Sequence, residues 1–248
     1  CESAWKTGDP GIAFMDRIWE TAPNPQLGRI ESTNPCGEEA LEDGGSCNLG
    51  SINLDKFVNN GTWDYDELER IIRLAVLFLD NVIEVNEFPL PFLKEVNLKT
   101  RRIGLGVMGW ADALVSLKIP YDSDEALEMA SVIGGFIRTT AWDESAYLAK
   151  ERGPFLEYEN SALKAQGFPP VRHSSVITIA PTGTIARIAG GASFGIEPIF
   201  ALGYESNVLW ENHEGKSTKL VDYPRAIIEE LGLDETLLRT AHQITPEW

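Results

Sequence analysis

The stretch Asn34-Pro35-Cys36-Gly37-Glu38, followed by Cys47-Asn-Leu-Gly-Ser-Ile-Asn-Leu54, is the most informative part of this chain of 248 residues. It offers an amide, a thiol and a carboxylate within five residues, and a second thiol follows eleven positions after the first. Proline and glycine favour a turn over a helix here. A thiol beside a possible base on one tight loop favours a chemical role. The structural alternative is a buried cysteine beside a turn, with Glu38 in solvent.

Two further stretches extend this pattern. They are Gly104-Leu-Gly-Val-Met-Gly-Trp-Ala-Asp-Ala-Leu114 and Ala180-Pro-Thr-Gly-Thr-Ile-Ala-Arg-Ile-Ala-Gly190, the latter followed by Ser193-Phe-Gly-Ile-Glu-Pro-Ile-Phe-Ala201. Together and in this order, the three motifs resemble the catalytic subunit of ribonucleotide reductases, most closely the adenosylcobalamin-dependent (class II) enzymes. The resemblance covers essentially the whole chain. It implies an α/β fold, part of the ten-stranded α/β barrel of that family, with the loop around Cys36 projecting into the centre.

The resemblance also implies roles for four side chains. Cys36 carries the thiyl radical that abstracts a hydrogen atom from the ribose. Glu38 takes the proton of the 3′-hydroxyl as a general base, and Asn34 orients the ribose hydroxyls. Cys47 is one member of the redox pair that forms a disulfide at the end of turnover. Its family partner lies well upstream of the motif. Cys1, in a predicted helix, does not match that position and is not assigned to the pair.

The segment Pro181-Thr182-Gly183-Thr184-Ile185-Ala186 follows the β-branched run Ser175–Ala180 and opens a predicted helix. Backbone N–H groups at a helix N-terminus favour an anion, and Gly183 permits close approach. The resemblance assigns this segment to the phosphates of the substrate. Without a following lysine it is not a P-loop. A plain strand–turn–helix junction is the alternative.

The segment Gly104-Leu-Gly-Val-Met-Gly109 also fits the dinucleotide-binding fingerprint, and acidic residues follow from Asp124 onward at a suitable spacing. This pattern supports a rival hypothesis, an NAD-dependent oxidoreductase. The preceding Asn97–Arg102 is too polar for the buried first strand of that fold. We therefore favour a close-packed strand–helix junction, as the family resemblance implies. A non-enzymatic acidic binding domain is a further alternative.

Composition excludes several classes of function. The formal net charge of −17 argues against a nucleic-acid-binding surface. The sequence lacks an apolar run long enough for a membrane span and shows no signal-peptide pattern at its start. Three cysteines fit a reducing cytoplasm better than a disulfide framework. Scattered histidines make a protein-ligated metal site unexpected. We therefore expect a cytoplasmic protein that binds no metal through its own side chains.

Hydrophobic periodicity and turn residues predict strands alternating with helices, hence mainly parallel strands. Pro89 and Pro91 end the clearest helix, and Asp64 is its predicted N-cap. Residues 155–172 are expected to form a loop with one helical turn, and residues 207–219 are expected to be irregular. The predicted helices cover 2–20 with a break near 8–11, 65–87, 109–117, 124–150, 223–231 and 235–242. The predicted strands cover 51–58, 101–105, 175–180 and 199–202.

The resemblance implies cofactors and partners as well. A class II enzyme uses adenosylcobalamin and an external dithiol such as thioredoxin. A class I large subunit, which has similar motifs, relies instead on a separate metal-radical subunit. The substrate is a ribonucleoside diphosphate, with a triphosphate left open. The full-length enzyme forms a homodimer and binds nucleotide effectors. We expect residues 1–248 to be a partial barrel domain, without the effector region, ATP-cone or C-terminal tail, and to be inactive alone.

Overall fold

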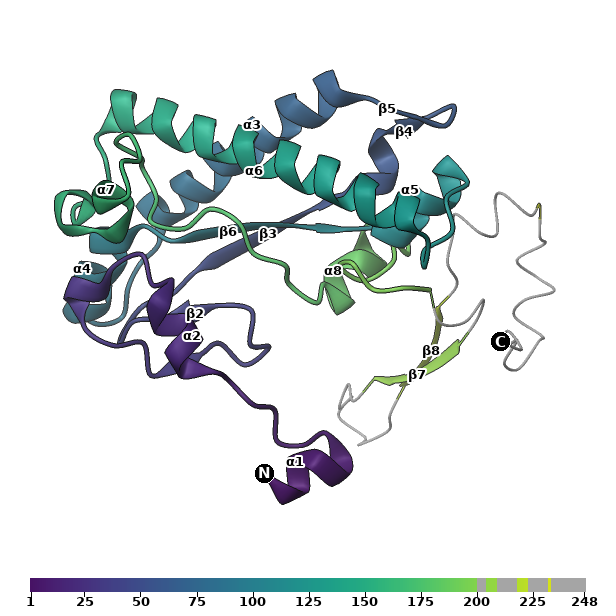
Figure 1. Ribbon diagram of the computed structural model, residues 1–248, viewed down its shortest axis with the longest axis horizontal. Helices are drawn as coiled ribbons and strands as arrows, with labels where there is room; N and C mark the ends of the chain where they lie inside the picture. Colours follow the sequence, from purple (N-terminus) through teal and green to yellow (C-terminus); the bar gives the residue numbers. More distant parts are fainter. Residues whose placement is uncertain (200–203, 209–217, 223–231, 233–248) are drawn as a thin grey trace. The chain divides into compact units, whose positions relative to one another are not determined.

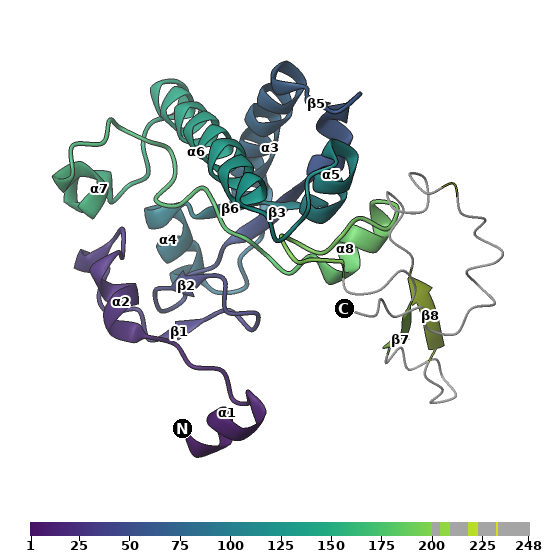
Figure 2. The ribbon, with the colours of Figure 1, turned by 45° about the vertical axis from the view of Figure 1, so that its right-hand side comes forward.

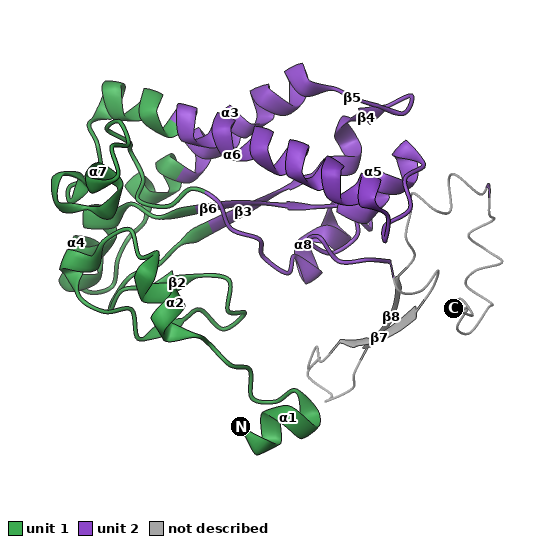
Figure 3. Cartoon of the chain, viewed as in Figure 1, with its two compact units in different colours: residues 1–48, 80–103, 145–176 green, residues 49–79, 104–144, 177–248 purple. Residues whose placement is uncertain are grey.

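The computed structural model describes residues 1–199, 204–208, 218–222 and 232 (Figure 1). The chain divides into two compact units (Figure 3). The first unit comprises residues 1–48, 80–103 and 145–176. The second unit comprises residues 49–79, 104–144 and 177–248. Each unit therefore gathers segments that lie far apart in the sequence.

The elements that lie wholly in the first unit are short. They are α1 (Glu2–Thr7), α2 (Met15–Glu20), the 3₁₀ helix η1 (Pro25–Leu27), β1 (Ser32–Thr33), β2 (Ala40–Leu41), α4 (Pro91–Thr100), the 3₁₀ helix η3 (Tyr158–Asn160) and α7 (Ala162–Ala165). Gly8, with φ of 77°, ends α1 in the left-handed conformation. The predicted break near residues 8–11 is thus confirmed.

Helix α4 is a correction to the prediction, which treated Pro91 only as the end of the preceding helix. Pro91 stands instead at the start of a new helix, where its missing N–H costs nothing and its fixed φ is suitable. Arg101, with φ of 46°, ends α4. The polar run Asn97–Arg102 is consequently a helix end and a turn, and the predicted strand begins later, at Ile103.

Four elements contain residues of both units: β3 (Asn48–Asn53), α3 (Tyr65–Val85), β6 (Ile103–Met108) and α6 (Asp124–Arg152). The second unit adds the 3₁₀ helix η2 (Leu54–Phe57), β4 (Val58–Asn59), β5 (Thr62–Trp63), α5 (Trp110–Leu117), α8 (Gly183–Ile188), β7 (Tyr204–Val208) and β8 (Thr218–Asp222). Strands β3 and β6 pair with each other. The second-unit parts of α3 and α6 lie side by side over this pair (Figure 2). Tyr65 and Phe136 make an edge-on ring contact there, with centroids 5.1 Å apart.

Helix α3 confirms the clearest prediction. Its buried stripe follows a helical period and consists of Leu68, Ile72, Val76, Leu79 and Ile83. The carboxylate of Asp64 accepts a hydrogen bond of 3.1 Å from the backbone N–H of Glu67, as expected of an N-cap. Helices α5 and α6 also begin and end within two residues of their predicted limits.

The strand predictions need correction. The run Ser175–Ala180 is not a regular strand but makes a single parallel bridge, between Ile177 and Leu105. The predicted strand 51–58 is split, since β3 ends at Asn53 and a 3₁₀ helix follows. The pairs β1–β2, β4–β5 and β7–β8 are antiparallel, whereas mainly parallel strands were expected. Short local connections permit only antiparallel pairing.

Some predictions fall near or beyond the described residues. The ends of the supposedly irregular stretch 207–219 belong to β7 and β8, so that prediction is wrong at both ends. The strand predicted at 199–202 lies outside the described residues except for its first position, and the helices predicted at 223–231 and 235–242 lie outside them entirely. Within the described part of the chain, no helix is both long and apolar enough to span a membrane.

A buried ionic network ties the first unit together around Asp80, which is fully buried at the centre of the network. Its carboxylate accepts hydrogen bonds from four side chains: Arg101, Arg152, Arg172 and His173. Burial alone would raise the pKa of Asp80, but the hydrogen bonds from His173 and Arg101 outweigh it and hold the pKa well below its usual range. The charged carboxylate therefore joins α3, the end of α4, the end of α6 and the segment after α7.

Candidate active site

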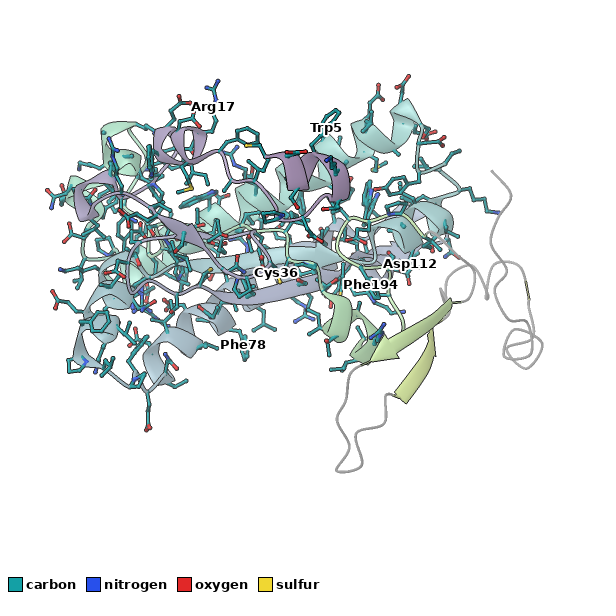
Figure 4. All side chains as sticks on the ribbon, turned by 90° about the horizontal axis from the view of Figure 1, so that it is seen from below. Trp5, Arg17, Cys36, Phe78, Asp112 and Phe194 are labelled. Carbon is teal, nitrogen blue, oxygen red and sulfur yellow. The ribbon has the colours of Figure 1, made fainter. Side chains whose placement is uncertain are left out.

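Cys36 lies in the loop of a short hairpin in the first unit (Figure 4). Ser32 pairs with Leu41 and Thr33 with Ala40, and these pairs form β1 and β2. The thiol is exposed. A hairpin loop presents a side chain to its surroundings while the strand pair fixes the two ends of the loop. The predicted turn around Cys36 is confirmed.

Asn34 shapes this loop. Its side-chain oxygen accepts hydrogen bonds from the backbone N–H of Gly37, at 3.1 Å, and of Glu39, at 3.0 Å. Its own N–H donates to the carbonyl of Glu39 at 2.9 Å. Gly37 takes φ of 88°, a conformation that favours glycine. Since the side-chain oxygen of Asn34 is hydrogen-bonded within the loop, the NH₂ group is the part of this side chain that can bind a ligand.

Two carboxylates follow Cys36 directly. Glu38, the predicted base, is half-buried and lies two residues after the thiol on the same loop, whereas Glu39 is buried. The structure thus places Asn34, Cys36 and Glu38 on one loop of six residues between β1 and β2. An exposed thiol with a carboxylate and an amide on one loop can pair hydrogen-atom chemistry with proton transfer.

Cys47 has very different surroundings. It is half-buried directly before β3. Burial raises the pKa of its thiol well above the ordinary value, and the negative charge of Glu39 adds to the effect, while Arg102 opposes it. A cavity of about 140 Å³ adjoins it. The lining residues are Ser46, Cys47, Asn48, Val82, Ile83, Asn86, Asn97 and Arg102. The thiol is therefore held neutral.

The predicted phosphate-binding segment Pro181–Ala186 belongs to the second unit. Thr182 caps α8 with φ of 58°, and its hydroxyl accepts a hydrogen bond of 2.7 Å from the N–H of Gly195. Ala186 is fully buried in a small apolar cluster with Met108. A Cβ built on Gly183 would meet no described atom within 4 Å. The backbone at Gly183 is thus free of close neighbours among the described residues, whereas Thr182 and Ala186 make contacts within the fold.

The motif Gly104–Gly109 is a strand followed by a helix start. All six residues of β6 are buried. A Cβ on Gly106 would lie 2.2 Å from the carbonyl oxygen of Thr178, and one on Gly109 would lie 2.2 Å from the side-chain oxygen of Asn53. These glycines allow close packing, so the predicted strand–helix junction is confirmed. The segment is buried and is not the exposed loop that a dinucleotide requires.

A buried aspartate links two of the motifs in the second unit. The carboxylate of Asp112, on α5, accepts a hydrogen bond of 2.6 Å from the N–H of Ser193, and the N–H of Gly109 donates to the carbonyl of Ser193 at 2.8 Å. Burial raises the pKa of Asp112. Asp112 and Phe194, the residue after Ser193, are both marked in Figure 4. The segment after α8 is thereby fixed to the start of α5.

Sequence reasoning did not find a second arrangement of polar groups, a serine, a histidine and an aspartate in line. Ser145 Oγ lies 2.9 Å from Nδ1 of His173, and Nε2 of His173 lies 3.1 Å from Asp80. The order of groups matches that of serine hydrolases. All three are fully buried, and burial lowers the pKa of His173, which stays neutral. With no access for a substrate, the arrangement is structural.

Comparison with known proteins identifies the family. Residues 1–170 match the family model described as "Ribonucleotide reductase, barrel domain". The chain therefore belongs to the ribonucleotide reductase family, through the barrel domain, and the fold expected from the resemblance is confirmed.

Three relatives illustrate the similarity. The vitamin B12-dependent ribonucleoside-diphosphate reductase of Thermoplasma acidophilum is 43% identical over the whole chain, which covers 35% of that protein. The enzyme of the same name from Mycobacterium tuberculosis (strain CDC 1551 / Oshkosh) is 48% identical over 82% of the chain and 29% of that protein. The ribonucleoside-diphosphate reductase subunit alpha of Chlamydia pneumoniae is 31% identical over 98% of the chain and 29% of that protein. The chain thus spans about a third of the length of these relatives.

Proposed function

We propose that this chain carries part of the active site of a ribonucleotide reductase that converts ribonucleoside diphosphates into 2′-deoxyribonucleotides, the precursors of DNA. One observation carries the proposal: Cys36 is an exposed thiol on a hairpin loop that Asn34 shapes and Glu38 shares. The names of the relatives support reduction of diphosphates in particular.

The chemistry explains why these groups belong together. Hydroxide is a poor leaving group, but a radical at C3′ of the ribose makes loss of water from C2′ feasible. A thiyl radical on Cys36 takes the hydrogen atom from C3′, and Glu38 takes the proton of the 3′-hydroxyl. The NH₂ group of Asn34 donates to a ribose hydroxyl. Two thiols are oxidised to one disulfide, the C2′–O bond breaks, and the products are the deoxyribose and one water.

Cys47 is our candidate for one of those two thiols. The raised pKa keeps its hydrogen in place at neutral pH, so the thiol enters the reaction in its reduced, protonated form. Its partner, by the family resemblance, lies upstream of the motif. An external dithiol of the thioredoxin type then restores both thiols by disulfide exchange.

Adenosylcobalamin is the proposed source of the radical. The exposed thiol of Cys36 fits such a source, since its S–H bond is accessible on the loop. Two relatives named vitamin B12-dependent, at 43% and 48% identity, support this assignment. When bound, the cofactor supplies the radical that removes the hydrogen atom of this thiol. A class I mechanism with a metal-radical subunit is the second candidate, favoured by the relative named subunit alpha at 31% identity.

The remaining parts of the proposal concern the substrate phosphates and the partners. The open backbone at Gly183 supports phosphate binding by Pro181–Ala186. Homodimer formation, nucleotide effectors and a cytoplasmic location belong to the proposal through the family resemblance.

The test uses the complete gene product that contains this sequence. Anaerobic reduction of CDP is assayed with adenosylcobalamin and dithiothreitol, without a metal-radical subunit. We expect dCDP from the wild type and from Cys1→Ser, and none from Cys36→Ser. Activity only after a metal-radical subunit is added would replace class II by class I. Equal activity of Cys36→Ser and the wild type would refute the proposed role of Cys36.

A further inference from the structure

We propose that Asn97 is a positioning residue for Cys47: it fixes the loop that ends at this cysteine and so sets how far the thiol is shielded. The inference rests on the proposed function only in giving Cys47 a redox role. Whether the amide of Asn97, fifty positions along the chain, controls the exposure of the Cys47 thiol is a separate question from the redox role.

The amide of Asn97 makes four hydrogen bonds. Its oxygen accepts from the backbone N–H of Ser46, at 2.9 Å, and from the hydroxyl of Ser46. Its nitrogen donates to the carbonyl of Gly44, at 3.1 Å, and to that of Leu93, at 2.8 Å. An asparagine side chain accepts two hydrogen bonds and donates two, so its capacity is fully used. Three of the four bonds hold the residues directly before Cys47.

Burial and helix propensity give the same indication. Asn97 is only 5% exposed and lies in α4, although asparagine is a weak helix former. A residue needed only for the helix would be better replaced by alanine or leucine. The contacts with Ser46 and Gly44 provide a reason for an amide at this position.

A second anchor holds the same loop from its other end. Arg102 donates two hydrogen bonds, of 2.9 and 2.8 Å, to the carboxylate of Glu42, and both side chains are only 4% exposed. The carbonyl of Glu42 accepts from the N–H of Gly45 at 2.8 Å. Gly44, with φ of 73°, lies against the ring of Phe92. The chain from Glu42 to Ser46 is therefore fixed on both sides, and this fixes the position of Cys47, the next residue.

The consequence for the thiol follows from the cavity beside it, which Cys47, Asn97 and Arg102 all line. Without the amide, the loop loses three hydrogen bonds and the cavity widens toward water. Hydration favours the thiolate, which is the form that reacts with alkylating agents. The nearby carboxylates of Glu38 and Glu39 and the guanidinium of Arg102 remain in both cases, so the change isolates the effect of position.

The experiment measures alkylation of Cys47 by iodoacetamide in the complete gene product, read by mass spectrometry on the peptide that contains Cys47, from pH 7 upward. In Asn97→Ala the pKa of this thiol is expected to fall, and each unit of fall raises the thiolate fraction, and with it the rate, about tenfold. The matched control is Thr100→Val, a buried position of α4 whose hydroxyl, among the described residues, donates to the carbonyl of Val96 in the same helix. It is expected to react like the wild type.

A gentler variant covers the case in which Asn97→Ala does not fold, as judged by circular dichroism. Ser46→Ala removes only the hydroxyl bond to Asn97 and is expected to raise the rate in the same direction, by less. An unchanged rate in folded Asn97→Ala, or in Ser46→Ala if the first variant is unfolded, would overturn the proposal. Because alkylation is read without turnover, failure of nucleotide reduction would refute the proposed function and not this inference.

Discussion

Cys36 and Cys47 are eleven residues apart, yet the chain holds them by opposite means. Cys36 is exposed, and the contacts that shape its loop come from Asn34, within the same hairpin. Cys47 is half-buried, and the contacts that fix its loop come from Asn97 and Arg102, more than fifty residues away. A thiol that must meet a substrate can rely on local structure. Shielding a thiol from water needs groups from elsewhere in the fold.

The largest expected effect comes from removing the carboxylate that pairs with Arg102. Glu42→Ala leaves the buried guanidinium of Arg102 without its carboxylate, which costs about 3–5 kcal/mol in the free energy of unfolding. Urea unfolding measures this, with Glu2→Ala, which breaks an exposed pair with Lys6, as a control near zero. Alkylation of Cys47 should rise in the same variant while that of Cys36 stays unchanged. A parallel rise at Cys36 would show that the two thiols are not held independently.

Asn34→Ala tests the local side of the comparison. It removes the acceptor of two backbone N–H groups in the Cys36 loop, which corresponds to about 1–3 kcal/mol. We expect kcat for nucleotide reduction to fall far more than this loss of stability explains, because the loop no longer presents Cys36 and Glu38 together. Alkylation of Cys47 should stay at the wild-type rate. Activity close to that of the wild type would argue against a role for the loop geometry.

The pH dependence of stability sharpens the contrast. Burial, aided by the charge of Glu39, raises the pKa of folded Cys47 above its ordinary value of 9.0, so above about pH 9 the unfolded chain binds fewer protons than the folded one. The contribution of Cys47 to the free energy of unfolding is therefore fully present below that pH. It falls as the pH rises further, by at most about 1.4 kcal/mol per pH unit.

Urea unfolding of the wild type and of Cys47→Ala at about pH 8 and about pH 10 checks this slope, because the other titrating groups cancel in the difference. The variant should lose less stability than the wild type over this interval. Identical losses would mean that the thiol is not shielded in solution.

The smallest effect is expected at Gly37. Its φ of 88° favours glycine, so Gly37→Ala costs about 1 kcal/mol or somewhat more. No described atom lies within 4 Å of the added Cβ, so backbone strain alone carries the cost. Thermal unfolding measures this cost. The control is Gly134→Ala in α6, where the added Cβ also meets no described atom within 4 Å; its backbone is helical, so this variant is expected to be more stable than the wild type. A gain of stability in Gly37→Ala would contradict the loop conformation.

The sequence predicted well what depends on neighbours along the chain. The turn around Cys36, the stripe of α3 from Leu68 to Ile83 and the cap at Asp64 all follow from local spacing and side-chain chemistry. The helix after Pro91 was missed because a proline both ends one helix and can begin another. The bonds from Asn97 to Ser46 and from Arg102 to Glu42 join residues 51 and 60 positions apart, and no local period encodes them.

The network around Asp80 has a consequence for how the chain folds during synthesis. Its partners Arg101, Arg152 and His173 lie 21, 72 and 93 positions from Asp80. A ribosome that has released only the segment before Arg101 has delivered the Asp80 carboxylate with none of these hydrogen-bond donors. Contacts of such long sequence separation form late, because much chain must be ordered before they close. The first unit therefore reaches its final packing only once His173 has emerged, and until then the nascent chain depends on the shorter contacts of α3 and of the Cys36 hairpin.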